Sequence, residues 1–247
     1  MLKVLILFGS ESDKYVYDSL IEKLSEFSQV DFAVLSAHRD PAALEIKLQE
    51  SSADMILAGA GLAAHLPGVI AAKVMVPVCG IPVNSVFAGL DALASIQQMP
   101  FGVPVLTSAP DNTERLAKFV SEVAKGKVKN KQINLVFPQD KKSDKYFQKE
   151  LQRSKEFAQE RGFLIKESAF LDDATININL VNDESEVIEG STVLHIPVLS
   201  DEQKNRPEFL CQLLKWVNKG GLWFGVNNCR NALIFIEKLN KMTITKE

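Results

Sequence analysis

The chain has 247 residues, a formal net charge of -3 at pH 7, 46% hydrophobic residues and 24% charged residues. This composition is ordinary for a globular protein, and the net charge gives no basic surface for nucleic acid. The sequence contains no apolar run long enough for a membrane helix. We therefore expect neither a nucleic-acid nor a membrane partner. Cys79, Cys211 and Cys229 lie far apart without a C-x-x-C spacing, which argues against a disulfide framework or a zinc site and favours the cytoplasm.

The first half of the chain alternates apolar runs with helical patterns, joined by short segments. Apolar runs predict strands at residues 3–8, 30–35, 54–59, 77–83 and 102–108. Helical spacing predicts helices through residues 16–27, from Pro41 after the second strand, and over residues 64–75, 89–98 and 112–123. This order predicts an α/β fold, a three-layer doubly wound parallel sheet of the flavodoxin-like or Rossmann-like type. In such sheets ligands bind beyond the carboxyl ends of the strands.

A polar, lysine-rich stretch at residues 124–132 interrupts the apolar pattern and predicts a linker. Beyond it three short matches return in order: SDKY of residues 12–15 at 143–146, IPV of 81–83 at 196–198, and the helix-opening Asn112 at Asn231. Phe147, Leu151 and Ala158 also take the places of Val16, Leu20 and Phe27. We therefore predict two tandem copies of one fold, residues 1–126 and 131–247, with 16 residues lost from the second copy between its first two matches.

The loops after the first two strands carry groups suited to a phosphorylated ligand. In "GSESD", glycine permits a sharp turn, Ser10 and Ser12 suit a phosphate, and Asp13 suits sugar hydroxyls. The alternative is a helix cap, with Ser12 as N-cap and Asp13 in the first turn. In "SAHRDP", His38 is suited to proton transfer near neutral pH and Arg39 to phosphate, although such a pair also occurs in solvated surface loops.

The loop after the third strand, "AGAGLAAHLPGVIAAK", is rich in small residues. Gly59, Gly61 and Gly68 permit either close approach to a ligand or tight helix-to-strand packing, and Pro67 suits a helix start. Position 64 is alanine and the loop follows the third strand, so dinucleotide binding is a weak alternative. His38 and His65 lack the spacing typical of metal ligands, so we predict no metal. Three such loops in succession predict one shared pocket.

Five motifs, "GSESD", "SAHRDP", "AGAGLAAHLPGVIAAK", "PVCGIPV" and "GLDALASIQQMPFGVPV", occur in order within residues 3–124. In these the chain resembles the bacterial-type phosphoribosylaminoimidazole carboxylases and N5-carboxyaminoimidazole ribonucleotide mutases of purine biosynthesis. The resemblance implies an enzyme without cofactor or metal that moves a carboxyl group of a ribonucleotide from an exocyclic nitrogen to ring carbon C4. It also implies a proton shuttle at His38 and substrate binding by Gly9, Ser10, Ser12, Asp13, Ser36, Arg39, Ala60, Gly61, His65 and Leu66.

Several alternatives and departures accompany this resemblance. Arg39 favours the mutases over the direct carboxylases, which often carry lysine there and use carbon dioxide. A direct carboxylase and a non-catalytic nucleotide-binding module remain alternatives. The lactate-racemase cofactor carboxylase is a more distant one, because it carries this domain after an unrelated N-terminal region. Departures from the family pattern are Leu62 for glycine, Asp40 for threonine, Ala92 for serine and Phe101 for a basic or polar residue. Of these, Leu62 is expected to narrow the pocket.

The second copy keeps folding signals but not the site motifs. "GSESD" has become "PQDKKSD", no counterpart of "AHR" or of the glycine-rich loop is visible, and residues 221–239 keep a strand, a turn and an apolar-faced helix. His195 takes the place of Gly80 on a strand, which is typical of a packed or capping histidine. We therefore predict a scaffold lobe. Since members of the resembled family are usually octamers with sites at subunit contacts, we expect a homo-oligomer, a homotetramer that imitates an octamer.

Overall fold

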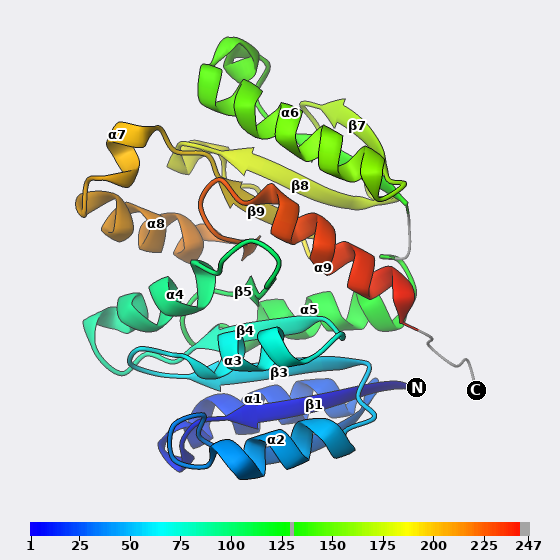
Figure 1. Cartoon of the computed structure of the whole chain (residues 1–247), viewed down its shortest axis with the longest axis vertical. Helices are drawn as coiled ribbons and strands as arrows, with labels where there is room; N and C mark the ends of the chain where they lie inside the picture. Colours follow the sequence, from blue (N-terminus) through cyan, green and yellow to red (C-terminus); the bar gives the residue numbers. More distant parts are fainter. Residues whose placement is uncertain (129–130, 243–247) are drawn as a thin grey trace.

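The computed structural model describes residues 1–128 and 131–242, which form one ten-stranded sheet covered by helices on both faces (Figure 1). The strands are β1 (Leu2–Phe8), β2 (Ser28–Val34), β3 (Met55–Ala60), β4 (Val78–Pro82), β5 (Leu106–Thr107), β6 (Gln132–Val136), β7 (Leu164–Ser168), β8 (Ile176–Val181), β9 (Val193–Pro197) and β10 (Leu222–Trp223). The α-helices are α1 (Lys14–Ser25), α2 (Pro41–Glu50), α3 (Leu66–Lys73), α4 (Leu90–Gln97), α5 (Thr113–Ala124), α6 (Lys145–Glu160), α7 (Asp201–Lys204), α8 (Glu208–Lys219) and α9 (Cys229–Lys241). Short 3-10 turns are η1 (Glu11–Asp13), η2 (Phe87–Gly89), η3 (Gln139–Ser143) and η4 (Glu184–Glu186).

The strand order is β2-β1-β3-β4-β5-β10-β9-β8-β6-β7. From the outer edge of the sheet toward its centre, the strands of each half therefore follow the order second, first, third, fourth and fifth. This is the flavodoxin-like order, and it confirms the predicted doubly wound α/β fold. The order reverses between β1 and β3, which places the expected ligand crevice of the first half there.

The two halves meet through an antiparallel pair of short strands. Thr107 of β5 pairs with Trp223 of β10, whereas the other strand pairings described for the chain are parallel. The prediction of parallel strands therefore holds within each half but not between them. β5 and β10 are each the fifth strand of their half. Two such strands run in opposite directions when an approximate two-fold axis places them side by side, which explains the antiparallel junction.

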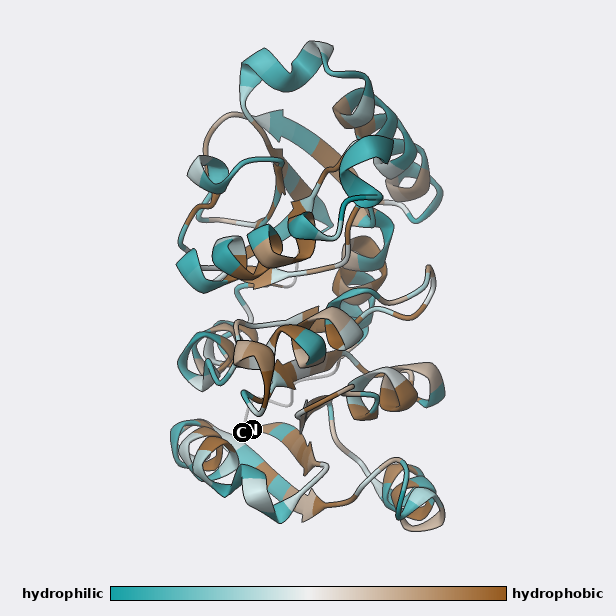
Figure 2. Cartoon of the chain, turned by 90° about the vertical axis from the view of Figure 1, so that its left-hand side faces the viewer, coloured by the Kyte–Doolittle hydropathy of each residue, from teal (hydrophilic) through white to brown (hydrophobic). Residues whose placement is uncertain are grey.

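The hydrophobic core is continuous across this junction. One face of the sheet is covered by α1, α5, α9 and α6, whose buried side chains belong to a single cluster. Phe119 of α5 and Phe235 of α9 join the halves there, with ring centroids 6.1 Å apart. The opposite face carries α2, α3 and α4 over the first half and α8 over the second. Figure 2 shows hydrophobic residues on the strands and on the sides of helices turned to the sheet.

Most predicted elements of the first half are confirmed to within a few residues. β1 is buried on both faces, as its unbroken apolar run predicts: Leu5 and Leu7 pack on one side and Val4, Ile6 and Phe8 on the other. The predicted strand at residues 102–108 is reduced to Leu106–Thr107. Pro104 has no N–H for a ladder, and residues 100–103 form a turn instead. Within the described residues, no helix has the length and apolar character needed to span a membrane.

The second half lacks two helices that the first half has. A loop at residues 169–175 replaces the crossover helix between its second and third strands, and only η4 stands between its third and fourth. The predicted deficit of 16 residues therefore falls at these connections. Of the predicted linker at 124–132, residues 129 and 130 lie outside the described residues.

The proposed match of Asn231 to the helix-capping Asn112 was wrong. Asn112 does cap α5, because its side chain accepts a hydrogen bond from the Arg115 N–H at 3.1 Å. By contrast, Asn231 lies inside α9, which Asn228 precedes. The buried Asn231 side chain accepts from the Gly102 N–H at 2.9 Å and donates to the Pro100 carbonyl at 3.0 Å. It therefore joins the second half to the first.

Candidate active site

A cavity of about 510 Å³ lies at the carboxyl ends of β1, β2 and β3, beside the point where the strand order reverses. All of the sequence-predicted site residues line it. The lining residues are Gly9, Ser10, Ser12, Asp13, Ser36, Ala37, His38, Arg39, Ala60, Gly61, Leu62, Ala63, Ala64, His65, Leu66 and Ser85. The structure thus brings three loops of the first half together around one pocket, as the sequence predicted.

The loop after β1 turns around the hydroxyl of Ser10. Ser10 is the N-cap of η1, and its Oγ accepts the N–H of Ser12 at 3.3 Å and lies 2.8 Å from the Ser12 hydroxyl. The interpretation of Ser12 as the cap was wrong, because Ser10 is the residue with the extended backbone that a cap requires. Both hydroxyls nevertheless line the pocket.

Asp13 holds a buried carboxylate that its own helix does not use. The residue is 7% exposed, precedes α1 and makes no side-chain capping bond. Burial raises the pKa of Asp13, the Ser12 hydroxyl at 3.0 Å lowers it, and the charge of Asp111 raises it again. The Asp13 carboxylate is therefore available to accept hydrogen bonds from hydroxyls of a ligand.

The loop after β2 presents His38 and Arg39 through Ser36. The Ser36 Oγ accepts the N–H groups of His38 and Arg39 at 3.3 and 3.2 Å, which folds the loop into a tight turn. The Arg39 guanidinium donates to the Gly9 carbonyl at 2.7 Å and so joins this loop to the one after β1. Asp40 closes the turn by accepting the Ser36 N–H at 3.1 Å, so this side chain has a structural role in the loop.

The two histidines of the first half lie together at this pocket. The rings of His38 and His65 meet edge to face, with centroids 5.0 Å apart and an angle of 72° between their planes. His65 comes directly before α3, and Pro67 stands in the first turn of that helix, as predicted. Among the described residues, no cluster of three or more metal-ligating side chains is present.

The loop after β3 packs tightly against Ser85. A Cβ atom at Gly61 would lie 3.0 Å from the Ser85 Oγ, closer than most side chains tolerate. Leu62 has a φ of 53°, in the left-handed region that favours glycine, and its N–H donates to the Ser85 Oγ at 3.1 Å. Leu62 is 59% exposed at the mouth of the pocket, so it borders the opening rather than filling the interior.

Sequence reasoning gave no role to Ala37, Ala63, Ala64 or Ser85. The first three are neighbours of predicted residues. Ser85 comes from the connection after β4 and lies between the motifs at residues 77–83 and 89–105, neither of which contains it. The rule that located the other loops also applies to it, because a polar residue directly beyond the carboxyl end of a buried parallel strand reaches the same crevice.

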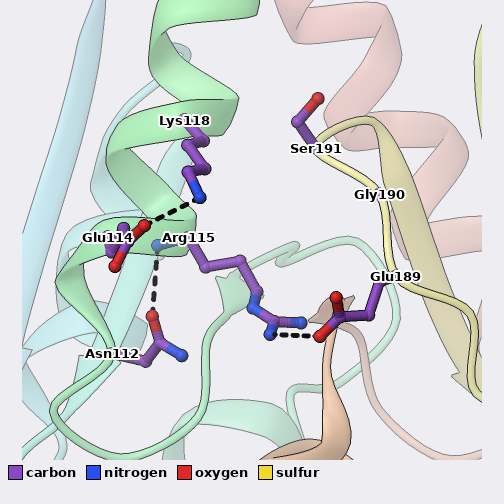
Figure 3. A pocket seen from close by; sticks show the side chains of 7 residues that line it. All are labelled: Asn112, Glu114, Arg115, Lys118, Glu189, Gly190 and Ser191. Carbon is purple, nitrogen blue, oxygen red and sulfur yellow. Dashed lines mark hydrogen bonds and ion pairs between the residues drawn. The ribbon is translucent and has the colours of Figure 1, made fainter.

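A second cavity, of about 480 Å³, lies between the start of α5 and the segment before β9 (Figure 3). Its cations are already paired: Lys118 with Glu114 at 2.7 Å, and Arg115 with Glu189 at 3.3 Å. Because these charges are balanced within the protein, this cavity has less to offer an anionic ligand than the pocket at β1 to β3.

The second half uses its corresponding loops for its own folding. The Glu186 carboxylate accepts the N–H groups of Asn182 and Asp183 at 2.7 and 3.3 Å, directly beyond β8. His195 is fully buried and stacks on Trp223, with centroids 4.5 Å apart, and its Nε2 accepts the Ile188 N–H at 3.2 Å. Burial lowers the pKa of His195 to about 3. This confirms the prediction of a packed histidine.

Known proteins match the part of the chain that contains this pocket. The family described as AIR carboxylase matches residues 3–144, which contain every lining residue. The N5-carboxyaminoimidazole ribonucleotide mutase of Methanocaldococcus jannaschii is 39% identical over 145 residues, 58% of this chain and 92% of that protein. The phosphoribosylaminoimidazole carboxylase of Saccharomyces cerevisiae is 43% identical over 117 residues, 45% of this chain and 20% of that protein. A crystal structure of Treponema denticola PurE aligns at 25% identity and a TM-score of 0.42, over 50% of this chain and 82% of that chain. With the matched residues covering more than half of its length, this chain belongs to the AIR carboxylase family.

Proposed function

We propose that the first half of this chain is an N5-carboxyaminoimidazole ribonucleotide mutase of purine biosynthesis. The observation that carries the proposal is the pocket in which His38 and His65 lie together with Ser10, Asp13 and Arg39. One set of side chains suits proton transfer, and the other suits a ribose and a phosphate. A ribonucleotide with a small planar base matches both sets and the size of the cavity.

The phosphate and ribose end is held by the loops after β1 and β2. The hydroxyls of Ser10 and Ser12 and the guanidinium of Arg39 are donors for phosphate oxygens. The Asp13 carboxylate accepts hydrogen bonds from the ribose hydroxyls, since it has no capping bond to α1. Held in this way, the nucleotide extends its base toward the loop after β3, where Ala60, Gly61, His65 and Leu66 line the cavity.

The reaction is a transfer of carbon dioxide within the closed pocket. The bond between the exocyclic nitrogen and the carboxyl carbon breaks, and the nitrogen gains a proton from the protonated ring of His38, which becomes neutral. The electron-rich C4 of the aminoimidazole then attacks the released carbon dioxide. The C4 proton then leaves to the neutral imidazole of His38, so that one proton is given and one taken. A positioned acid–base group of this kind contributes roughly 10² to 10⁴ in rate. Each step uses only groups of the substrate and of this chain.

The test of this proposal is His38→Asn. Asparagine keeps the polarity and approximate size of the side chain but cannot exchange a proton near neutral pH, so turnover is expected to fall by about 10² or more. Calorimetric binding of the carboxylated product should stay within about threefold of wild type. A wild-type protein that binds the ribonucleotide without turnover would instead support a non-catalytic nucleotide-binding module.

A second experiment separates the mutase from a direct carboxylase. The carbamate-bearing ribonucleotide and, separately, aminoimidazole ribonucleotide with bicarbonate are supplied at low carbon dioxide. We expect the first to react and the second to react poorly, because Arg39 is the residue that the mutases carry after the histidine. Faster reaction of the second substrate would favour the direct carboxylase.

We also propose that residues 131–247 are a degenerate repeat of residues 1–126 and act as a scaffold in a homotetramer that imitates an octamer. The shared strand order, the antiparallel junction and the occupied loops beyond β8 support the repeat. Two exposed apolar side chains support a subunit contact near the pocket: Leu62, which lines it and is 59% exposed, and Phe87, two residues after the lining residue Ser85 and 78% exposed. Light scattering tests it, and a stable, active monomer would contradict it.

A further inference from the structure

The loop after β4 (residues 83–89) contributes Ser85 to the pocket and is held by a residue that does not line the pocket. Asp111, in the turn before α5, accepts the Asn84 N–H at 3.0 Å through its Oδ1. The Tyr15 hydroxyl lies 3.2 Å from each oxygen of the same carboxylate. Asp111 therefore ties the connection after β4 to the start of α1 and to the start of α5.

The next residue along the loop carries this contact into the pocket. Ser85, which follows Asn84, accepts the Leu62 N–H at 3.1 Å and packs against Gly61. The Asp111 carboxylate thus connects through one peptide unit and one hydroxyl to the glycine-rich loop after β3. Because the Ser85 oxygen accepts from Leu62, its own O–H proton is left to donate elsewhere, and Ser85 lines the cavity.

The backbone along this path is unfavourable without such contacts. Leu62, Phe87 and Ala88 have φ values of 53°, 50° and 55°, in the left-handed region that residues other than glycine, asparagine and aspartate avoid. Asp111, whose residue type tolerates this region, has a φ of 57°. Residues in this region persist only when the surrounding structure fixes them. A carboxylate that accepts from a backbone N–H and a tyrosine hydroxyl is a strong fixed point for such a loop.

We propose that Asp111 is a positioning residue that acts through Asn84 and Ser85 to hold the glycine-rich loop in its closing conformation. The inference rests on the proposed mutase function and deepens it. The loop encloses the end of the pocket where the base and its carboxyl group lie, whereas the phosphate and ribose end is held by other loops. Loss of the Asp111 carboxylate should therefore affect turnover more than affinity for the nucleotide.

The test uses two substitutions at Asp111, to glycine and to asparagine, and both residue types tolerate a positive φ. Asp111→Gly removes the carboxylate without adding backbone strain, and Asp111→Asn restores an acceptor for the Asn84 N–H. Asp111→Gly is expected to lower kcat by about tenfold to a hundredfold while KM changes less than about threefold, as for loss of a charged hydrogen bond. Asp111→Asn should recover most of this loss.

Hydrogen exchange gives a readout that does not depend on turnover. In Asp111→Gly the amides of Leu62 and Asn84 should exchange at least about tenfold faster, while those of β1 and β3 are unchanged. Asp18→Asn is the matched control, because Asp18 forms only an exposed ion pair with Lys14 on α1. Ser85→Ala should speed exchange at Leu62 but not at Asn84, and its effect on kcat should not add to that of Asp111→Gly.

Two outcomes would overturn the inference. In the first, Asp111→Gly keeps the kcat and the amide exchange rates of the wild type. In the second, its amides exchange faster throughout the sheet, which would indicate a general structural role. A wild-type protein with no turnover of either substrate would refute the proposed function, and the exchange measurement would still decide whether Asp111 holds the loop.

Discussion

At the scale of single residues, the repeated letters SDKY serve two different purposes. Asp144 caps α6, since its carboxylate accepts the N–H groups of Tyr146 and Phe147 at 2.8 and 3.1 Å. Asp13 holds the same place before α1 but makes no such bond and lies buried in the pocket. The same residue type thus stabilises a helix in the second half and remains available to a ligand in the first.

The buried Asp13 carboxylate leads to a prediction on affinity and stability. Burial raises the pKa of Asp13, so the ionised carboxylate is less favourable in the folded chain than it is in water. Asp13→Asn should therefore weaken ribonucleotide binding by about tenfold or more, through loss of a charged acceptor. Its unfolding free energy at pH 7 should not fall. Calorimetric binding and chemical denaturation measure the two quantities, and Asp144→Asn, expected to lower stability but leave binding unchanged, is the control.

His195 predicts a pH dependence of stability. The folded-state pKa of about 3 lies below the ordinary value of 6.5, because burial disfavours the charged ring. Above pH 6.5 the neutral ring makes its full contribution to the unfolding free energy. This contribution is lost as the pH falls toward 3, at up to about 1.4 kcal/mol per pH unit. His195→Gln cannot titrate, so its unfolding free energy should fall less steeply between pH 6.5 and 3. Equal slopes in denaturant titrations of the two proteins would contradict this.

At the scale of elements, the second half replaces crossover helices with hydrogen-bonded loops. The loop at residues 169–175 connects the second and third strands of its half, as α2 does in the first half, and buried asparagines on β6 and β8 hold it. Asn177 accepts from the Asn134 side chain and from the Asp172 N–H, each at 2.8 Å, and donates to the Asp172 carbonyl at 3.0 Å. A loop leaves backbone groups unpaired where a helix would not, so buried side-chain amides satisfy them.

This loop gives a stability prediction. Asn177→Ala removes a buried amide and leaves the partner groups in Asn134 and Asp172 unsatisfied, which should cost about 2 to 4 kcal/mol of unfolding free energy. The matched control is Asn205→Ala, since Asn205 is exposed after α7 and makes one side-chain bond, to the Asp201 carbonyl. Urea denaturation measures both variants. A loss below about 0.5 kcal/mol for Asn177→Ala would contradict the role given to it.

At the scale of the whole molecule, one sheet and one core cluster join the halves. β5 has only two residues and pairs with β4 on one side and β10 on the other. The contacts of Phe119 with Phe235, and of Asn231 with the turn at residues 100–103, add to this junction. An edge of the first half exposed by removal of the second would present unpaired backbone groups and apolar side chains.

We therefore predict that the full chain unfolds in one cooperative thermal transition rather than two. Residues 1–126 alone, which lack β10 and α9, should unfold at a lower temperature or aggregate. Differential scanning calorimetry of both proteins measures this. Two separate transitions in the full chain, with the first-half transition unchanged in the fragment, would show that the halves are independent.

The sequence by itself determined most elements of the first half and most residues of its pocket. Buried parallel strands are apolar runs without interruption, and the groups beyond their carboxyl ends reach one crevice, so local pattern and a topological rule were sufficient for Ser10 and His38. The role of His65 came from the family resemblance. The tertiary structure decided the rest. The antiparallel β5–β10 junction, the place of Asn231 inside α9 and the contact of Asp111 with the loop after β4 each join residues far apart in the chain. Such contacts depend on how elements meet in space, and a local pattern of residue types contains no information on that meeting.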